Sequence, residues 1–280
     1  MAMLRLAGWY YQQFDADYSL EVPGEGYGGW KSDPVELSAE HTALVVMHAW
    51  DAGTPEQFPG WYRAVEYLPR SAAICREVFP PLLGAARAAG LTVLHVVGGG
   101  DYFKKCPGHA RAVELADRLV PPEPARPKVT GDEASKAIRK LYPQRVFTGA
   151  GNAEDCRRGF ERVDFPSEAR PAGDEGVAQD SRQLLALCLE GGINHLVYVG
   201  FAINYCLTFS PGGMVDMSRA GLICSTIRQA TTAVENRETA REELHKREAM
   251  WLTSLLFGGF VFDVEPFIAA LRQAVVGAQS

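Results

Sequence analysis

The chain has 280 residues, 47% of them hydrophobic, which is enough for one domain with a large buried core. Its 28 basic and 34 acidic side chains give a formal net charge of −6, and the basic residues form no block. This balance argues against nucleic acid and against an anionic membrane surface as partners.

The cysteines and the amino terminus indicate the compartment. The six cysteines are scattered, with no CxxC pair and no regular spacing, as is typical of reduced thiols in a cytosol. Residues 1–11 lack the apolar core and the small-residue cleavage site of a signal peptide. No apolar run reaches the length needed to span a bilayer. We therefore expect a soluble cytoplasmic protein.

The first part of the chain divides into an arm and the start of a body. Residues 1–40 are rich in Gly, Tyr and Trp, and we expect an extended amino-terminal arm that docks on the body or on a neighbouring subunit. The body is expected over residues 41–280, with an inserted helical region over about 101–160. The elements predicted up to residue 160 are a buried strand over 42–47, a helix over 69–89, a second strand over 91–97 and a helix over 132–142.

The remaining elements continue the alternation of strand and helix. We expect a short edge strand over 162–164, a helix over 181–189, strands over 196–201 and 222–225, a long amphipathic helix over 237–256, a strand over 260–262 and a helix through 274. This alternation predicts a doubly wound α/β fold, with a mostly parallel sheet of six strands and helices on both faces. The strands 42–47 and 196–201 are expected side by side at its centre.

One cysteine follows a strand in a position that suits a nucleophile. Residues 195–200 read as a buried strand that ends at a glycine, and Cys206 falls on the first turn of the next helix. The helix dipole and the free N–H groups of that turn favour thiolate over thiol. The carboxyl end of a strand is also where open α/β sheets bind ligands. The alternative is a small buried core cysteine, which is the common role of the residue.

These two segments resemble the isochorismatase-like cysteine hydrolases, a family that includes nicotinamidases and N-carbamoyl amidohydrolases. Residues 42–50, Thr-Ala-Leu-Val-Val-Met-His-Ala-Trp, match the family's first strand, T-A-L-L-V-I-D-M-Q. Residues 200–206, Gly-Phe-Ala-Ile-Asn-Tyr-Cys, match its nucleophile motif, G-V-x-T-x-x-C. The resemblance covers about residues 40–263 and implies a three-layer fold in which a thiolate attacks a carbonyl carbon. It also implies an oxyanion hole beside a cis peptide, so that Phe201, Ala202 and Ile203 are expected to bind substrate.

The chain departs from the family at two of its catalytic positions. The resemblance implies an aspartate base where this chain has His48, and a lysine within residues 165–176, where Arg170 is the only cation. His48 has two interpretations: a general base paired with Cys206, or a hydrogen-bonded histidine at a strand end. In addition, residues 210–214, Ser-Pro-Gly-Gly-Met, predict that the helix after Cys206 breaks early.

Two further carboxylates are expected at the same edge of the sheet. Asp51 either enters the site or is a turn carboxylate, and Asp101 follows a glycine run as a residue of the rim. No metal is implied, because residues 51–63 contain no histidine and neither the histidines nor the cysteines have zinc spacing. The glycine run 98–100 lacks the pattern of a phosphate loop, so no cofactor is expected.

The sequence predicts a cysteine-dependent hydrolase of a C–N bond in a small amide or carbamoyl compound. The alternative is a catalytically silent protein of this fold that binds a small molecule or serves as an oligomeric scaffold, as the missing aspartate and lysine suggest. A histidine base would place the acidic limb of the pH–rate profile at about pH 6 to 7. The resemblance implies a homo-oligomer, a dimer or tetramer, and aromatic residues are enriched at such interfaces. The residues expected there are Trp9, Tyr10, Tyr11, Tyr27 and Trp30 of the arm, and Met250, Trp251, Leu255 and Leu256 of the long helix.

Overall fold

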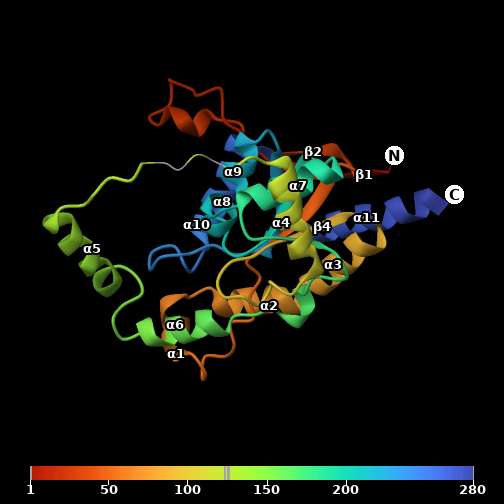
Figure 1. Cartoon of the computed structure of the whole chain (residues 1–280). Helices are drawn as coiled ribbons and strands as arrows, with labels where there is room; N and C mark the ends of the chain where they lie inside the picture. The colour runs from red at the N-terminus through yellow and green to blue at the C-terminus, as the bar shows by residue number, and fades with distance from the viewer. Residues whose placement is uncertain (1, 123, 125–126, 280) are drawn as a thin grey trace.

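One sheet of eight strands organises the chain, whose residues 2–122, 124 and 127–279 are described by the computed structural model. The strand order is β2-β1-β8-β7-β6-β3-β4-β5, and helices cover both faces (Figure 1). Six strands run parallel: β3 (Thr42–Met47), β4 (Thr92–Val96), β5 (Gly176–Ala178), β6 (His195–Gly200), β7 (Ile223–Thr231) and β8 (Gly258–Phe262). The doubly wound α/β fold predicted from the sequence is therefore confirmed.

The two additional strands come from the segment expected as an extended arm. β1 (Met3–Gln12) and β2 (Gly29–Ser38) form an antiparallel hairpin, and β1 joins the sheet through the pair Trp9 and Val261 of β8. The ring of Tyr11 packs edge-on against Trp30 and Trp251. The aromatic residues at the amino terminus thus fasten the hairpin to the body of the same chain, and the sheet has eight strands rather than six.

Alternate side chains of the strands feed two hydrophobic layers, as the two-residue period of a strand requires. Val45, Met47 and Tyr198 belong to one layer, and Leu44 and Val197 to the other. Helices α4 (Pro107–Leu119), α7 (Ser181–Gly191), α9 (Met214–Arg219) and α10 (Leu244–Leu256) cover the first layer. Helices α2 (Leu68–Glu77), α3 (Phe79–Ala88) and α11 (Val264–Gln279) cover the second.

Two predictions near prolines and turns were wrong. The helix expected over 69–89 divides into α2 and α3, because Pro80 and Pro81 in the first turn of α3 lack the N–H groups that would continue α2. Residues 162–164 are not a strand, since Asp164 forms only an isolated bridge with Asp51, and the edge strand is β5.

The helix expected over 237–256 begins only at Leu244. The reason is a buried carboxylate from outside the helix: Glu235 accepts the backbone N–H groups of His245 and Lys246 at 3.1 and 3.0 Å. Free N–H groups and the positive dipole at a helix start favour such a negative charge. The start of α10 is thus set by a long-range contact.

The segment from α4 to α6 (Ala153–Arg162) is mainly helical, and α5 (Glu133–Arg145) within it does not pack on the body (Figure 1). Helix α6 packs against α1 (Pro59–Ala64). The helix predicted over 132–142 is α5, with Asp132 as its N-cap. Helix α5 stands apart from the rest of the molecule (Figure 1). Among the described residues, no helix has the length and apolarity that crossing a membrane requires.

The chain reverses direction across the sheet between β3 and β6. From β3 it proceeds outward through β4 and β5, and β6 then returns to lie on the other side of β3. As predicted, β3 and β6 are neighbours, and the register pairs Met47 with Gly200. Ligands bind at the carboxyl ends of strands at such a switch point. His48 and the segment after Gly200 both begin there.

Gly200 is expected to tolerate no side chain. Its φ is 120°, and an added Cβ would lie 1.9 Å from the carbonyl oxygen of Met47. Gly200→Ala should lower the free energy of unfolding by about 3 kcal/mol or more, measured by urea titration. The matched control Gly84→Ala lies in α3 with open space around its Cβ, and it should raise stability by up to about 1 kcal/mol. Equal urea midpoints for Gly200→Ala and the unchanged chain would contradict this.

Candidate active site

The segment between β6 and the next helix carries the predicted nucleophile. Cys206 is the first residue of α8 (Cys206–Phe209), as expected, and the peptide bond between Phe201 and Ala202 is cis. The helix ends after four residues, just before Pro211, which confirms the break predicted there. Because the helix is so short, its dipole gives the thiol less support than a full helix would.

Backbone hydrogen bonds fix this turn against the neighbouring strands. The N–H of Phe201 donates to the carbonyl of Met47 at 3.1 Å, and that of Ile203 donates to Thr232 at 2.8 Å. Asn204 holds Val234 from both sides, donating to its carbonyl at 2.9 Å and accepting its N–H at 2.8 Å. The backbone around Cys206 is thus held in one arrangement before any ligand binds.

The three residues expected to bind substrate differ in what they can offer. The side chain of Phe201 stacks on Phe79 in the core, with ring centres 5.8 Å apart, and Ile203 is fully buried. The backbone N–H groups of both are already used. In contrast, the N–H groups of Ala202, Asn204 and Cys206 donate to no oxygen within the described residues. The turn therefore presents backbone donors rather than side chains.

The sulfur of Cys206 is in its neutral form in this environment. Burial raises the pKa of the Cys206 thiol, and hydrogen bonds from the Ser210 hydroxyl and the Ala202 N–H lower it by a smaller amount. The side chain also packs against the hydrophobic layer under α9 and α10. The free site therefore holds a thiol rather than the expected thiolate.

His48 ends β3 in a conformation that few residues adopt. Its φ is 49°, its N–H donates to Val96 at 2.9 Å, and its ring stacks on Trp50 with centres 5.0 Å apart. The ring Nδ1 is buried without a hydrogen-bond partner in the described structure, and Nε2 faces Gly98. Burial lowers the pKa of His48 to about 4. The imidazole is therefore neutral, and its Nδ1 has no hydrogen-bond partner among the described residues. This differs from the alternative considered above, in which His48 is a hydrogen-bonded histidine at a strand end.

His48 and Cys206 follow adjacent strands at the same edge of the sheet, as predicted. Across the described residues, no hydrogen bond joins their side chains. Burial shifts the two pKa values apart, that of the thiol upward and that of the imidazole downward. A thiolate–imidazolium pair is therefore disfavoured in the ligand-free protein.

Tyr67 is a residue near the nucleophile that the sequence did not indicate. It immediately precedes α2. In the sequence it comes before the inserted region, whereas Cys206 comes after that region. Burial raises the pKa of the Tyr67 hydroxyl, and the nearby Cys206 and Glu66 raise it further. Tyr67 packs against the hydrophobic layer that contains Phe201, a contact between distant parts of the chain, so no local pattern could have indicated it.

Three predicted residues of the site are engaged elsewhere. Asp51 is a turn carboxylate: it accepts the N–H of Gly53 at 2.9 Å and pairs with Arg162 at 3.2 Å. Asp101 is exposed and pairs with Lys104 at 2.6 Å. Arg170 pairs with Asp164 at 2.9 Å. None of the three is hydrogen-bonded to the nucleophile turn in the described part of the chain.

A cavity of about 280 Å³ opens beside the end of β3. Trp50, the residue on which His48 stacks, forms part of its wall together with Asp51, Ser71, Cys75 and Glu168. Its lining thus contains both polar and apolar side chains. The described residues contain no group of three or more His, Cys, Asp or Glu side chains arranged to hold a metal ion.

Solved structures match this chain in fold, although no protein-family model and no curated protein matches it. A cysteine hydrolase from Pseudomonas syringae pv. phaseolicola aligns with a TM-score of 0.50 at 15% identity, over 85% of this chain and 95% of that one. An isochorismatase family protein from Burkholderia thailandensis gives 0.45 and 15% identity, over 84% and 97%. The N-carbamoylsarcosine amidase from Thermoplasma acidophilum gives 0.39 and 14% identity, over 80% and 96%. The first of these matches shows that the chain shares the fold of that cysteine hydrolase, which is the fold that the sequence predicted.

The thiol of Cys206 is expected to react slowly near neutral pH. At pH 7, iodoacetamide should alkylate Cys206 more slowly than a free thiol of pKa about 8.5, because burial raises the pKa of this group. The rate should increase with pH, and Ser210→Ala should slow it further by removing one hydrogen bond to sulfur. Mass spectrometry of the Cys206 peptide over time measures both. Alkylation faster than the free thiol at pH 7 would show that the site activates its cysteine.

The buried imidazoles should make stability depend on pH. The unfolded chain binds a proton at His48 with a pKa of 6.5, whereas the folded chain binds it only at about 4, so the free energy of unfolding falls as pH drops from 6.5 to 4. His48 should account for about 3 kcal/mol of this change in the free energy of unfolding, and His48→Gln should remove that part. His195→Gln should remove a similar share, because burial lowers that pKa to about 4 as well. Urea titrations at several pH values measure this, and parallel pH curves for all three proteins would contradict it.

Proposed function

We propose that this chain is a divergent member of the isochorismatase-like cysteine hydrolases that cleaves a C–N bond in a small amide or carbamoyl compound, with Cys206 as the nucleophile. The main support is the turn after β6, where Cys206 begins α8 and the N–H of Ala202 donates to its sulfur rather than to a backbone oxygen. The turn stands at the switch point of the sheet, where open α/β folds bind ligands.

The backbone donors suit the charge that develops during such a reaction. As the sulfur of Cys206 bonds to the carbonyl carbon, the carbonyl oxygen becomes negative. The N–H groups of Ala202 and Cys206 can then stabilise that charge by donating hydrogen bonds to the oxygen. Collapse of this intermediate breaks the C–N bond and leaves an acyl thioester on Cys206, and water then releases the acid or carbamate. Because the turn is already fixed, these donors need little rearrangement.

His48 is the group proposed to transfer the proton in this reaction. The thiol must lose its proton as the C–S bond forms, and the neutral imidazole, with Nδ1 unbonded, can receive that proton and pass it to the departing amine. Since both groups are neutral in the free protein, transfer accompanies the attack and does not precede it. Substrate binding therefore brings about the charge separation.

The low pKa of His48 changes the expected pH profile. An imidazole of pKa about 4 stays able to accept a proton well below neutrality, so the acidic limb of kcat/KM should lie near pH 4 rather than at 6 to 7. The rate should also rise on the alkaline side, as the raised pKa of the Cys206 thiol is approached. Measuring kcat/KM between pH 3.5 and 10, values chosen to bracket roughly both groups, tests this. An acidic limb at about 6 to 7 would assign the base to a group with an ordinary histidine pKa.

A silent protein of the same fold is the second candidate. The observation that favours it is the neutral state of Cys206: burial raises the pKa of its thiol, and among the described residues no lysine or arginine contributes to lowering that pKa. Such a protein would bind a small molecule at the same edge without covalent chemistry. An activity screen combined with detection of the thioester separates the two candidates.

Replacing the nucleophile should abolish turnover. Using ammonia release from a panel of primary amides and N-carbamoyl amino acids, we expect no activity in Cys206→Ala and a loss of about 10² to 10⁴-fold in His48→Ala. The control Cys106→Ala, at the start of α4, should keep full activity. Mass spectrometry of rapidly quenched samples should show the acyl group on the Cys206 peptide.

Two outcomes would contradict the proposal in different ways. Full activity of Cys206→Ala would place the chemistry at another residue. If no compound of the panel is turned over and no amide acylates Cys206, the second candidate, a protein without catalytic activity, is the one supported.

A further inference from the structure

Two exposed segments carry apolar side chains that the body of this chain does not cover. The first is the loop over residues 13–28 between β1 and β2, called here the acidic loop. It contains Asp15, Asp17, Glu21 and Glu25 and no lysine or arginine. Its exposed large hydrophobic residues are Phe14, Tyr18 at 87% exposure, Leu20 and Val22. Large apolar side chains grouped on a surface commonly mark an interaction site.

The second segment is helix α5, which has no buried residue. Ile138 and Leu141 are exposed, Ile138 at 69%, and so is Tyr142. The spacing of these three, i, i+3 and i+4, places them on one face of the helix. A 13-residue helix is marginal in water when nothing packs on it. Helix α5 therefore has both an apolar face and a reason to need a partner.

The charges of the two segments are opposite. Over Glu133–Arg145, α5 has four basic residues and one acid, a net charge of +3, whereas the acidic loop has a net charge of −4. Lys136 pairs with Glu133 inside the helix, but Arg139, Lys140 and Arg145 form no ion pair with any described residue. Asp15, Glu21 and Glu25 form none in the described structure either.

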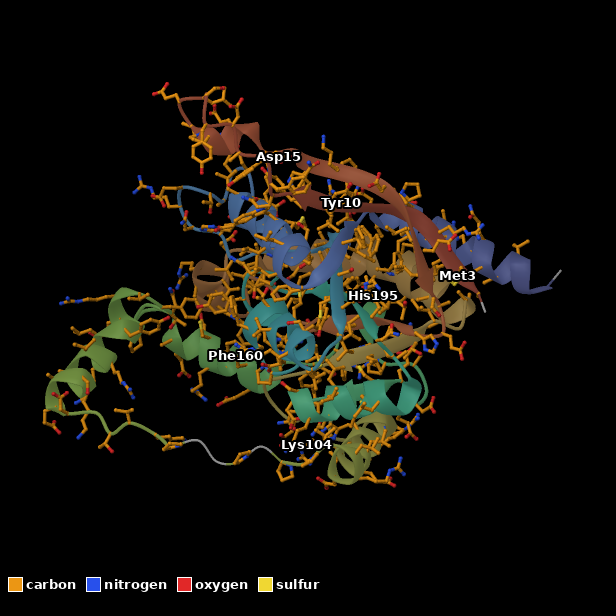
Figure 2. The ribbon with its side chains drawn as sticks, turned by 90° about the horizontal axis from the view of Figure 1, so that it is seen from above. Met3, Tyr10, Asp15, Lys104, Phe160 and His195 are labelled. Atoms are coloured by element: carbon orange, nitrogen blue, oxygen red, sulfur yellow. The ribbon has the colours of Figure 1, made fainter. Side chains whose placement is uncertain are left out.

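The two segments do not meet within one molecule. Figure 1 shows α5 and the loop between β1 and β2 at separate edges of the molecule, and Figure 2, turned by 90°, shows Asp15 and α5 far apart again. Meanwhile the aromatic residues of the hairpin, which were expected at an interface, pack on their own chain through Trp251 and Phe260. The acidic loop and α5, in contrast, keep their large apolar side chains exposed.

We propose that α5 of one copy of this chain docks on the acidic loop of a second copy. Ile138, Leu141 and Tyr142 would pack against the apolar side chains of the loop, while Arg139 and Lys140 would pair with its carboxylates. Because each copy carries both surfaces, two reciprocal contacts would close a dimer, and a non-reciprocal arrangement would close a larger ring. Charge pairs at the rim of such an interface set its specificity and its association rate.

Charge reversal tests the pairing of these two surfaces. The first variant, Arg139→Glu with Lys140→Glu and Arg145→Glu, makes α5 acidic. The second, Glu21→Lys with Glu25→Lys and Asp15→Asn, makes the loop basic and keeps at position 15 a residue that tolerates the left-handed backbone found there. Light scattering at micromolar concentration should give an oligomer for the unchanged chain and the monomer mass of 30.6 kDa for each variant alone. Mixing the two variants, or combining both sets of substitutions in one chain, should restore association.

Further measurements separate the apolar contribution and check folding. Ile138→Ser with Leu141→Ser should weaken association by at least about tenfold without changing any charge. All substituted residues are exposed. The circular dichroism spectrum of each variant should therefore match that of the unchanged chain, apart from any change in the helical signal of α5. Sedimentation with vesicles of phosphatidylserine and phosphatidylcholine tests whether α5 binds an anionic membrane instead.

Three results would overturn the proposal. The first is a mass of 30.6 kDa for the unchanged chain under all conditions. The second is an oligomer that either reversal leaves intact, which would place the interface on another surface. The third is vesicle binding that the α5 reversal abolishes while the chain stays monomeric, which would make the basic helix a membrane anchor.

Discussion

The close approach of Gly200 to Met47 is the constraint on which the candidate site depends. A Cβ at position 200 would lie 1.9 Å from the Met47 carbonyl oxygen, so only glycine lets β6 end against β3 in this way. The next residue, Phe201, then donates its N–H to the same oxygen. The close approach and this hydrogen bond hold the end of β3 and the start of the nucleophile turn together. Both His48 and Cys206 take their positions from it.

The site is organised by shape more than by charge. Burial keeps the thiol and the imidazole neutral, and in the described structure the charged side chains Asp51, Asp101 and Arg170 find partners away from the nucleophile turn. What the protein supplies in advance is a fixed backbone with unused N–H groups. Such preorganised donors act on charge that appears only as a reaction proceeds.

Local patterns in the sequence were sufficient for much of this picture. The buried β-branched runs predicted β3 and β6, the prolines and glycines after Cys206 predicted the end of α8, and Asp132 marked the start of α5. Features that depend on distant contacts were not predictable. Glu235 sets the start of α10 across a turn, Tyr67 reaches Cys206 through packing, and the hairpin joins the sheet through β8. The charge states of His48 and Cys206 also depend on burial, which a sequence does not display.

The backbone of His48 has a consequence for how this site can change. A φ of 49° is costly for most side chains, and glycine, asparagine, aspartate and histidine are the residues that adopt it most readily. Codons for histidine and aspartate differ only in their first base. A single mutation can therefore exchange an imidazole for a carboxylate at this strand end while the main chain stays in place. The backbone at this position thus favours a small set of residues, and two of them, histidine and aspartate, can act as bases.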